Sequence, residues 1–183
     1  MTYSKQHRNL KSGTMMPAIF IGHGNPVLQL SLDIDQDPQF HFDLGRALSS
    51  LRKKGVLILG SGNMTHNLSQ LSPGERPTKW ALSFDEDLKQ AIDAEEDQKL
   101  VHCKEENALY AMAHPSDEHY LPLLYLIAQR QTGDTLRYFN ADFDLSTISM
   151  RSFISAPWRS AHYECTARDC GGHRYLRGEF GSR

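Results

Sequence analysis

Cysteine is scarce in this chain, and so is any excess of one charge. The 183 residues include three cysteines, an odd number too small for a disulfide framework, so a reducing cytoplasm is the expected compartment. Lys and Arg number 20 against 22 Asp and Glu, which gives no electrostatic reason to expect a nucleic-acid or membrane partner. No apolar run approaches the roughly 18 residues of a membrane span. These absences favour one soluble domain.

Short apolar runs and amphipathic stretches alternate along most of the chain. Runs at 17–21, 27–32 and 56–59 predict strands, and the last is expected to be covered on both faces, as in a parallel sheet. Periodic apolar residues predict helices over 39–54, 79–94, 104–112 and 118–129, followed by closing strands over 135–140 and 145–153. This order predicts an α/β fold with a mixed or parallel central sheet flanked by helices.

The two ends of the chain differ in composition from the part between them. Residues 1–15 are polar and are expected to form a flexible leader, without the apolar core of a secretion signal. Residues 154–183 are rich in Arg and Gly and show no hydrophobic period, so a disordered tail is expected. One domain over 16–153 remains between them.

Three histidines lie in segments whose composition favours chemistry over packing. His23 follows a predicted strand between two glycines, and His66 follows the Gly-Ser-Gly-Asn turn at 60–63. His119 opens an apolar helix. Strand ends and helix starts are where α/β proteins collect catalytic groups, and imidazole is both a common metal ligand and a common general base. The three segments together predict one metal-assisted site.

Each histidine also has a simpler explanation. His23 can be an exposed turn residue, and His119 can be a surface residue at a helix start. The turn at 60–63 can instead hold an anion, although it lacks the lysine of a P-loop and the G-x-G-x-x-G spacing. His41, beside an aromatic residue in a predicted helix, is expected on the surface of that helix.

Polar residues near the histidines are candidate substrate contacts. Asn63 and Asn67 flank His66 and can orient its ring or hydrogen-bond a substrate oxygen. His114 lies in the loop before His119 and can line the entrance for a substrate.

Five segments together resemble one known enzyme family. The chain resembles the class III (LigB-type) extradiol ring-cleavage dioxygenases, and among them the branch of the 4,5-DOPA extradiol dioxygenases. The resemblance follows the family's order of motifs and covers most of residues 16–153. Its segments are residues 16–26, 28–33, 55–68, 118–125 and 148–152.

This resemblance implies a metal-dependent enzyme that opens the ring of a small catechol such as DOPA. By it, His23 and His119 are metal ligands, and His66 is the catalytic acid–base residue that moves a proton between catechol and oxygen. The implied cofactor is Fe(II) or Zn(II). The expected partners are the catechol and O2, with no nucleic acid and no membrane, and the oligomeric state is left open.

One part of the family's pattern has no counterpart here. In the family, a long segment with another metal-ligating histidine follows the turn matched by 23–26, whereas here Pro26 runs directly into Val27. Part of the family's N-terminal sheet is therefore expected to be missing. One alternative follows from this: a catalytically inactive, metal-binding remnant of the family. A separate alternative is an unrelated small-molecule-binding α/β domain whose turn at 60–62 holds an anion.

The tail contains a candidate for the missing ligand. His162 lies in Ser-Ala-His-Tyr, which resembles the family's Ser-Ala-His-Trp motif, and is a possible substitute metal ligand. With Cys165, Cys170 and His173 it also forms a spacing of four zinc-competent residues. An unstructured tail explains the same residues.

Overall fold

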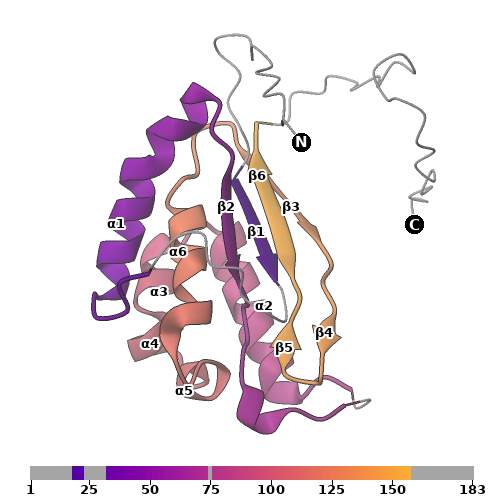
Figure 1. Ribbon diagram of the computed structural model, residues 1–183. Helices are drawn as coiled ribbons and strands as arrows, with labels where there is room; N and C mark the ends of the chain where they lie inside the picture. Colours follow the sequence, from indigo (N-terminus) through magenta and orange to yellow (C-terminus); the bar gives the residue numbers. More distant parts are fainter. Residues whose placement is uncertain (1–17, 23–31, 74–75, 158–183) are drawn as a thin grey trace, which may run out of the picture.

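A four-stranded mixed sheet is the centre of the protein (Figure 1). The computed structural model describes residues 18–22, 32–73 and 76–157, the first range through its backbone alone. The strand order is β2-β1-β6-β3, and β1 (Ala18–Gly22) and β2 (Ile58–Gly62) run parallel. β6 (Ser152–Ala156) pairs antiparallel with both β1 and β3 (Thr135–Phe139). The predicted α/β class with a mixed sheet is confirmed, whereas the described strands do not form a parallel sheet throughout.

Six α-helices and three short 3₁₀ helices accompany the sheet in the described residues. The α-helices are α1 (Pro38–Leu48), α2 (Lys79–Asp93), α3 (Asp97–Val101), α4 (Cys103–Glu106), α5 (Tyr110–Ala113) and α6 (Leu121–Ile127). The 3₁₀ helices are η1 (Ser49–Lys54), η2 (Leu68–Gln70) and η3 (Asp117–His119). A second, two-stranded sheet pairs β4 (Phe143–Asp144) with β5 (Ile148–Ser149).

α6 is buried between the sheet and α1 (Figure 1). All seven of its residues are buried. Two glycines allow this close packing: a Cβ on Gly60 of β2 would lie 2.2 Å from Leu126 Cδ2, and a Cβ on Gly45 of α1 would lie 2.7 Å from the backbone of Tyr125. At Gly45 the obstacle is backbone, so this approach of α1 to α6 depends on glycine. At Gly60 the obstacle is the end of the Leu126 side chain, which would have to move to admit a Cβ.

The helix predicted over 39–54 is one helical segment that tightens along its length. α1 begins after Asp37, whose carboxylate accepts a hydrogen bond from the Phe40 amide at 2.7 Å, and α1 continues as η1 up to Lys54. Gly55 ends the segment with φ of 79°, a left-handed conformation that glycine adopts readily at the end of a helix. The expected surface position of His41 is wrong, because α6 covers that side of α1: His41 is fully buried, with Nδ1 3.0 Å from the Tyr125 hydroxyl.

The strand predicted over 56–59 differs from the observed β2 in position and in burial. β2 begins at Ile58, so Val56 and Leu57 precede it, and both are exposed. Leu59 is 55% exposed although it is apolar, whereas the neighbouring Gly60 is buried under α6. The prediction of a strand covered on both faces is therefore wrong, since α6 covers only one face of β2.

Two further segments that were predicted as single elements are each divided into two elements in the structure. The strand predicted over 145–153 is divided into β5 and β6, and it begins with two residues at positive φ, Leu145 and Ser146. The helix predicted over 104–112 is two short helices, α4 and α5. β6 runs on to Ala156, so regular structure continues beyond the expected domain end at residue 153.

A buried ion pair joins η1 to the sheet. Arg52 is fully buried, and its guanidinium donates at 2.6 Å to the carboxylate of Asp134, whose side chain is 2% exposed. The same guanidinium donates to the backbone carbonyls of Gln129 and Ser155. The hydrogen bonds satisfy both charges and connect η1, the segment after α6 and β6.

Replacement of Arg52 by Leu is expected to lower the free energy of unfolding by about 3–5 kcal/mol, because it leaves Asp134 buried without its partner. Urea denaturation measures this loss. The exposed neighbour provides the control: Lys53→Leu is expected to change stability by no more than about 0.5 kcal/mol. The double variant Arg52→Leu/Asp134→Leu should recover much of the loss, and an unchanged urea midpoint in Arg52→Leu would contradict the stabilising role of the pair.

His114 lies in an aromatic part of the core. It is 3% exposed, and its ring packs against Phe84, Tyr110 and Tyr120 with centroid distances of 5.2 to 5.8 Å. Its Nε2 lies 3.0 Å from the carbonyl oxygen of Met64, while its Nδ1 has no hydrogen-bond partner among the described residues. Burial lowers the pKa of His114 from 6.5 to about 4. The folded protein therefore holds this ring neutral.

Acidification is expected to destabilise the protein through His114. Its pKa is about 4 in the folded chain and 6.5 without the fold, so the unfolded chain binds an extra proton between these values. The stability that depends on the neutral ring is fully present above pH 6.5 and is lost as the pH falls toward 4, by up to about 3 kcal/mol. Urea titrations across this range should give a shallower pH dependence for His114→Asn than for the parent. The exposed His102→Asn should follow the parent, and equal slopes for parent and His114→Asn would refute the prediction.

Candidate functional site

The loop after β2 is held against the segment that contains η3. Asn63, Met64 and Thr65 are fully buried directly after the end of the strand. The backbone amide of Asn63 donates to the carbonyl of His119 at 3.0 Å, and the amide of His66 donates to the carbonyl of Ala113 at 2.9 Å. Two backbone hydrogen bonds thus bring together two segments that are far apart in the sequence.

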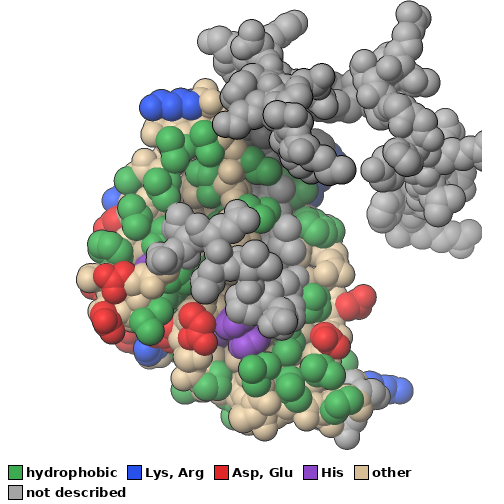
Figure 2. All heavy atoms as spheres, viewed as in Figure 1, with side chains coloured by type: hydrophobic (Ala, Val, Ile, Leu, Met, Phe, Trp, Pro, Cys, Tyr) green, Lys and Arg blue, Asp and Glu red, His purple; other side chains and the backbone are tan. Residues whose placement is uncertain are grey.

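His66 and His119 stack face to face at this junction. Their ring centroids lie 3.4 Å apart and their planes differ by 11°. His119 ends η3 and is 7% exposed, whereas His66 is partly exposed. Figure 2 shows histidine side chains reaching the surface on one face of the molecule, next to hydrophobic side chains. The structure therefore brings together two of the histidines that the sequence placed in one site.

Asn63 contacts the ring of His119. The side-chain oxygen of Asn63 lies 3.1 Å from His119 Nδ1, and its amide nitrogen donates to the carbonyl of Ser149 at 2.9 Å. Asn63 was expected to orient the His66 ring or to bind a substrate oxygen, whereas its side-chain contacts among the described residues are with His119 and Ser149. Its role as a substrate contact stays a prediction.

Asn67 caps η2. Its side-chain oxygen accepts from the amide and the hydroxyl of Ser69 at 2.9 and 2.5 Å, and its amide nitrogen donates to the carbonyl of Met112 at 2.6 Å. Both ends of the side chain are therefore bound to protein groups. A substrate contact by Asn67, like one by the buried His114, stays a prediction.

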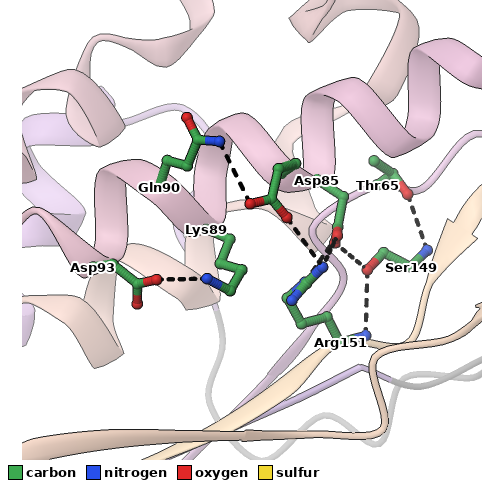
Figure 3. Close-up of polar contacts among 8 residues, drawn as sticks. Thr65, Asp85, Lys89, Gln90, Asp93, Ser149 and Arg151 are labelled. Carbon is green, nitrogen blue, oxygen red and sulfur yellow. Dashed lines mark hydrogen bonds and ion pairs between the residues drawn. The ribbon is translucent and has the colours of Figure 1, made fainter.

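A buried polar network lies behind the loop (Figure 3). The amide of Ser149 donates to Thr65 Oγ1 at 2.9 Å, and the hydroxyl of Ser149 donates to Asp85 Oδ1 at 2.5 Å. Arg151 donates from Nε to Asp85 Oδ2 at 2.8 Å and pairs with it through a second nitrogen at 2.6 Å. Burial alone would lower the pKa of Arg151, but the hydrogen bonds and charge of Asp85 raise it above its usual value.

Asp85 is a buried site residue that was not predicted from the sequence, although its position on α2 gives a signal. Asp85 lies three residues before Leu88 and four after Ala81, so it occupies the apolar face of α2, and it is 1% exposed. A carboxylate on the buried face of a helix requires a partner, and here Ser149 and Arg151 provide it.

Several predicted ligands lie outside the described residues, namely His23, His162, Cys165, Cys170 and His173. Within the described ranges, no group of three or more His, Cys, Asp or Glu side chains could hold a metal ion. His66 and His119 provide two imidazoles, and imidazole nitrogen is a donor that both Fe(II) and Zn(II) accept. The donor type therefore fits the metal that the resemblance implies.

Two hollows on the described surface lie away from these histidines. One of about 590 Å³ is lined largely by charged side chains at α3, including Glu95 and Asp97. The other, of about 350 Å³, includes Leu88 and Cys103. Burial raises the pKa of the Cys103 thiol to about 11, so this group is not a thiolate nucleophile at neutral pH. No helix in the described part of the chain is long and apolar enough to cross a membrane.

The chain is similar to known proteins of one family. The family model described as "Catalytic LigB subunit of aromatic ring-opening dioxygenase" matches residues 1–139. A relative from Escherichia coli (strain K12), named 4,5-DOPA dioxygenase extradiol, is 31% identical over 132 residues, which cover 69% of this chain and 48% of the relative. A protein of the same name from Beta vulgaris is 35% identical over 99 residues, covering 54% of this chain and 37% of the relative.

A solved structure is also similar. The crystal structure of the uncharacterized protein JW3007 from Escherichia coli K12 matches with a TM-score of 0.63 and 29% sequence identity, covering 68% of this chain and 52% of that one. The chain spans about half the length of these bacterial proteins. Because the family model matches most of the chain, and because its residue range contains both stacked histidines, the chain belongs to the LigB family of aromatic ring-opening dioxygenases.

Proposed function

We propose that this protein is a metal-dependent extradiol dioxygenase that opens the ring of a small catechol, such as DOPA, with O2. The stacking of His66 on His119 carries the proposal, since it places two imidazoles from distant segments at the end of β2. Relatives named 4,5-DOPA dioxygenase support the catechol as the substrate class. The proposed catalytic domain is 16–153, extended to the end of β6, between a leader at 1–15 and a tail.

In this proposal the three histidines have different roles. His119 and His23 hold Fe(II), or Zn(II) in its place, and the bound metal supplies binding and activation of the catechol and O2. His66 is the acid–base residue: its ring is partly exposed, so it can exchange a proton with a catechol hydroxyl, while His119 is almost wholly buried beside it. The contact between the two rings keeps the proton-moving group next to the metal ligand.

The chain spans about half the length of its bacterial relatives, and the proposal accounts for this difference in length. We attribute it to the family segment that is missing after Pro26, which carries part of the N-terminal sheet and another metal-ligating histidine. The position of β2 at the edge of the described sheet and the 55% exposure of Leu59 support this, because strands or helices that would cover them are lacking among the described residues. His162 is the proposed substitute ligand.

The second candidate function is a metal-binding remnant without turnover. One observation favours it: the chain spans 48% of the relative from Escherichia coli, and the segment that carries another metal-ligating histidine in the family has no counterpart after Pro26. A site that keeps two histidine ligands, His23 and His119, would bind a metal ion more weakly than one with three protein ligands. Metal binding without ring cleavage is the property that separates this candidate from the enzyme.

A ring-cleavage assay tests the proposal. Protein loaded anaerobically with Fe(II) is mixed with DOPA, air is admitted, and the coloured semialdehyde is followed by absorbance. His66→Ala is expected to lower turnover at least about 100-fold, because the acid–base group is lost, while metal content is retained. His119→Ala is expected to lose both metal and activity. The exposed His102→Ala is the matched control and should behave as the parent does.

Metal analysis of the same samples separates the candidates. One metal per chain without colour supports the inactive remnant, and neither metal nor colour contradicts both candidates. Colour that is unchanged in His66→Ala would contradict the acid–base role of this residue while leaving the reaction class in place.

A further inference from the structure

We propose that Asn63 is a positioning residue that fixes the neutral His119 ring in the tautomer with its proton on Nδ1. Nε2 then keeps its lone pair and is the nitrogen offered to a metal ion. The tautomer follows from described contacts alone, and only the use of Nε2 as a metal ligand rests on the proposed function.

The orientation of the Asn63 amide follows from Ser149. The two ends of an Asn side chain have nearly the same shape, so their assignment depends on their hydrogen-bond partners. One end lies 2.9 Å from the backbone carbonyl of Ser149, which can only accept, so this end is the NH2 group. The carbonyl is held in place because the Ser149 amide donates to Thr65 and the Ser149 hydroxyl donates to Asp85 (Figure 3).

The tautomer of His119 follows from this orientation. The other end of the Asn63 side chain is the carbonyl oxygen, which lies 3.1 Å from His119 Nδ1 and can only accept. Nδ1 must therefore carry the proton, and in a neutral imidazole the second nitrogen is then unprotonated. Asn63 is fully buried, so water cannot easily replace either partner.

His114 provides an internal comparison, because its proton is on the other ring nitrogen. Its Nε2 lies 3.0 Å from the backbone carbonyl of Met64, which can only accept, so in His114 the proton is on Nε2. Adjacent residues, Asn63 and Met64, thus set opposite tautomers in two histidines of the same segment. A measurement that resolves both rings contains its own reference.

The proposed consequence is tighter metal binding. A metal-ligating histidine commonly donates its other ring N–H to a carbonyl or carboxylate, and loss of that partner typically weakens metal binding by about 10–100-fold. Asn63 supplies such an acceptor to His119. Without it, the ring can rotate or move its proton to Nε2, and this nitrogen would have to lose the proton before it binds a metal.

Nitrogen NMR of the metal-free protein tests the tautomer directly. Histidines are labelled with 15N, and long-range 1H–15N correlations are recorded well above the usual imidazole pKa of about 6.5. His119 and His114 signals are assigned by their absence in His119→Gln and His114→Asn. The expected result is a proton on Nδ1 of His119 and on Nε2 of His114. A proton on Nε2 of His119 in the parent protein overturns the proposal, whatever the variants do.

Two variants test the part played by Asn63. Asn63→Asp keeps an acceptor for the His119 N–H and should retain the Nδ1 tautomer, whereas Asn63→Leu removes the acceptor and should leave the tautomer mixed. Asn107→Leu removes an Asn whose side chain contacts Asp87 and the Leu109 amide instead of either histidine; it is the matched control and should leave the tautomer unchanged. Retention of a pure Nδ1 tautomer in folded Asn63→Leu would overturn the positioning role.

Zn(II) titration separates this inference from the proposed function. Asn63→Leu is expected to bind Zn(II) about 10–100-fold more weakly than the parent, with Asn107→Leu unchanged. If the parent shows the expected tautomers but binds no Zn(II), the positioning of His119 stands and its role as a metal ligand fails. Equal Zn(II) affinity in the parent and in folded Asn63→Leu overturns the proposed effect on the metal.

Discussion

The close packing of α6 on β2 determines the rest of the described structure. Gly60 lets Leu126 approach the strand, and this contact sets where α6 lies. η3 leads directly into α6, so His119 is carried to the end of the sheet by the same packing. The loop after β2 begins there, and hence the stacked rings meet where a strand end and a helix start converge. Hydrophobic contact thus sets the position of the two histidines, and polar groups set the orientation of the His119 ring.

The orientation comes from charges and amides that are buried but fully paired. Asp85 is 1% exposed and is satisfied by Ser149 and Arg151, and Ser149 in turn fixes the amide of Asn63. A buried carboxylate without partners would cost several kcal/mol, so this network can persist only in one arrangement. A site built on such a network has a defined geometry before any ligand arrives.

Much of the fold and the pairing of two site residues could be predicted from the sequence. α2 agrees closely with the helix predicted over 79–94 from its periodic apolar face. The encounter of His66 with His119 follows from motifs at a strand end and a helix start, because packing concentrates such ends at one edge of a sheet.

The predictions that were wrong failed for a common reason: they depend on contacts between elements that are distant in the sequence. His41 looks like a surface residue in its helix, but the close approach of α1 to α6 at Gly45 buries it. An apolar run indicates that a strand can be buried, but it does not show which faces will be covered. The 55% exposure of Leu59 could therefore not be predicted from the run. The function of Asn63 depends on the carbonyl of Ser149, a backbone group whose position no sequence pattern encodes.

The contact between Gly60 and Leu126 also constrains how this sequence can evolve. A methyl group at position 60 would lie 2.2 Å from the Leu126 side chain, so the two positions are sterically one unit. Alanine at 60 requires the Leu126 side chain to move or to be replaced by a smaller one, and a smaller residue at 126 would open a cavity that the methyl group could fill. Substitutions at these two positions should therefore be energetically coupled although the residues are distant in the sequence.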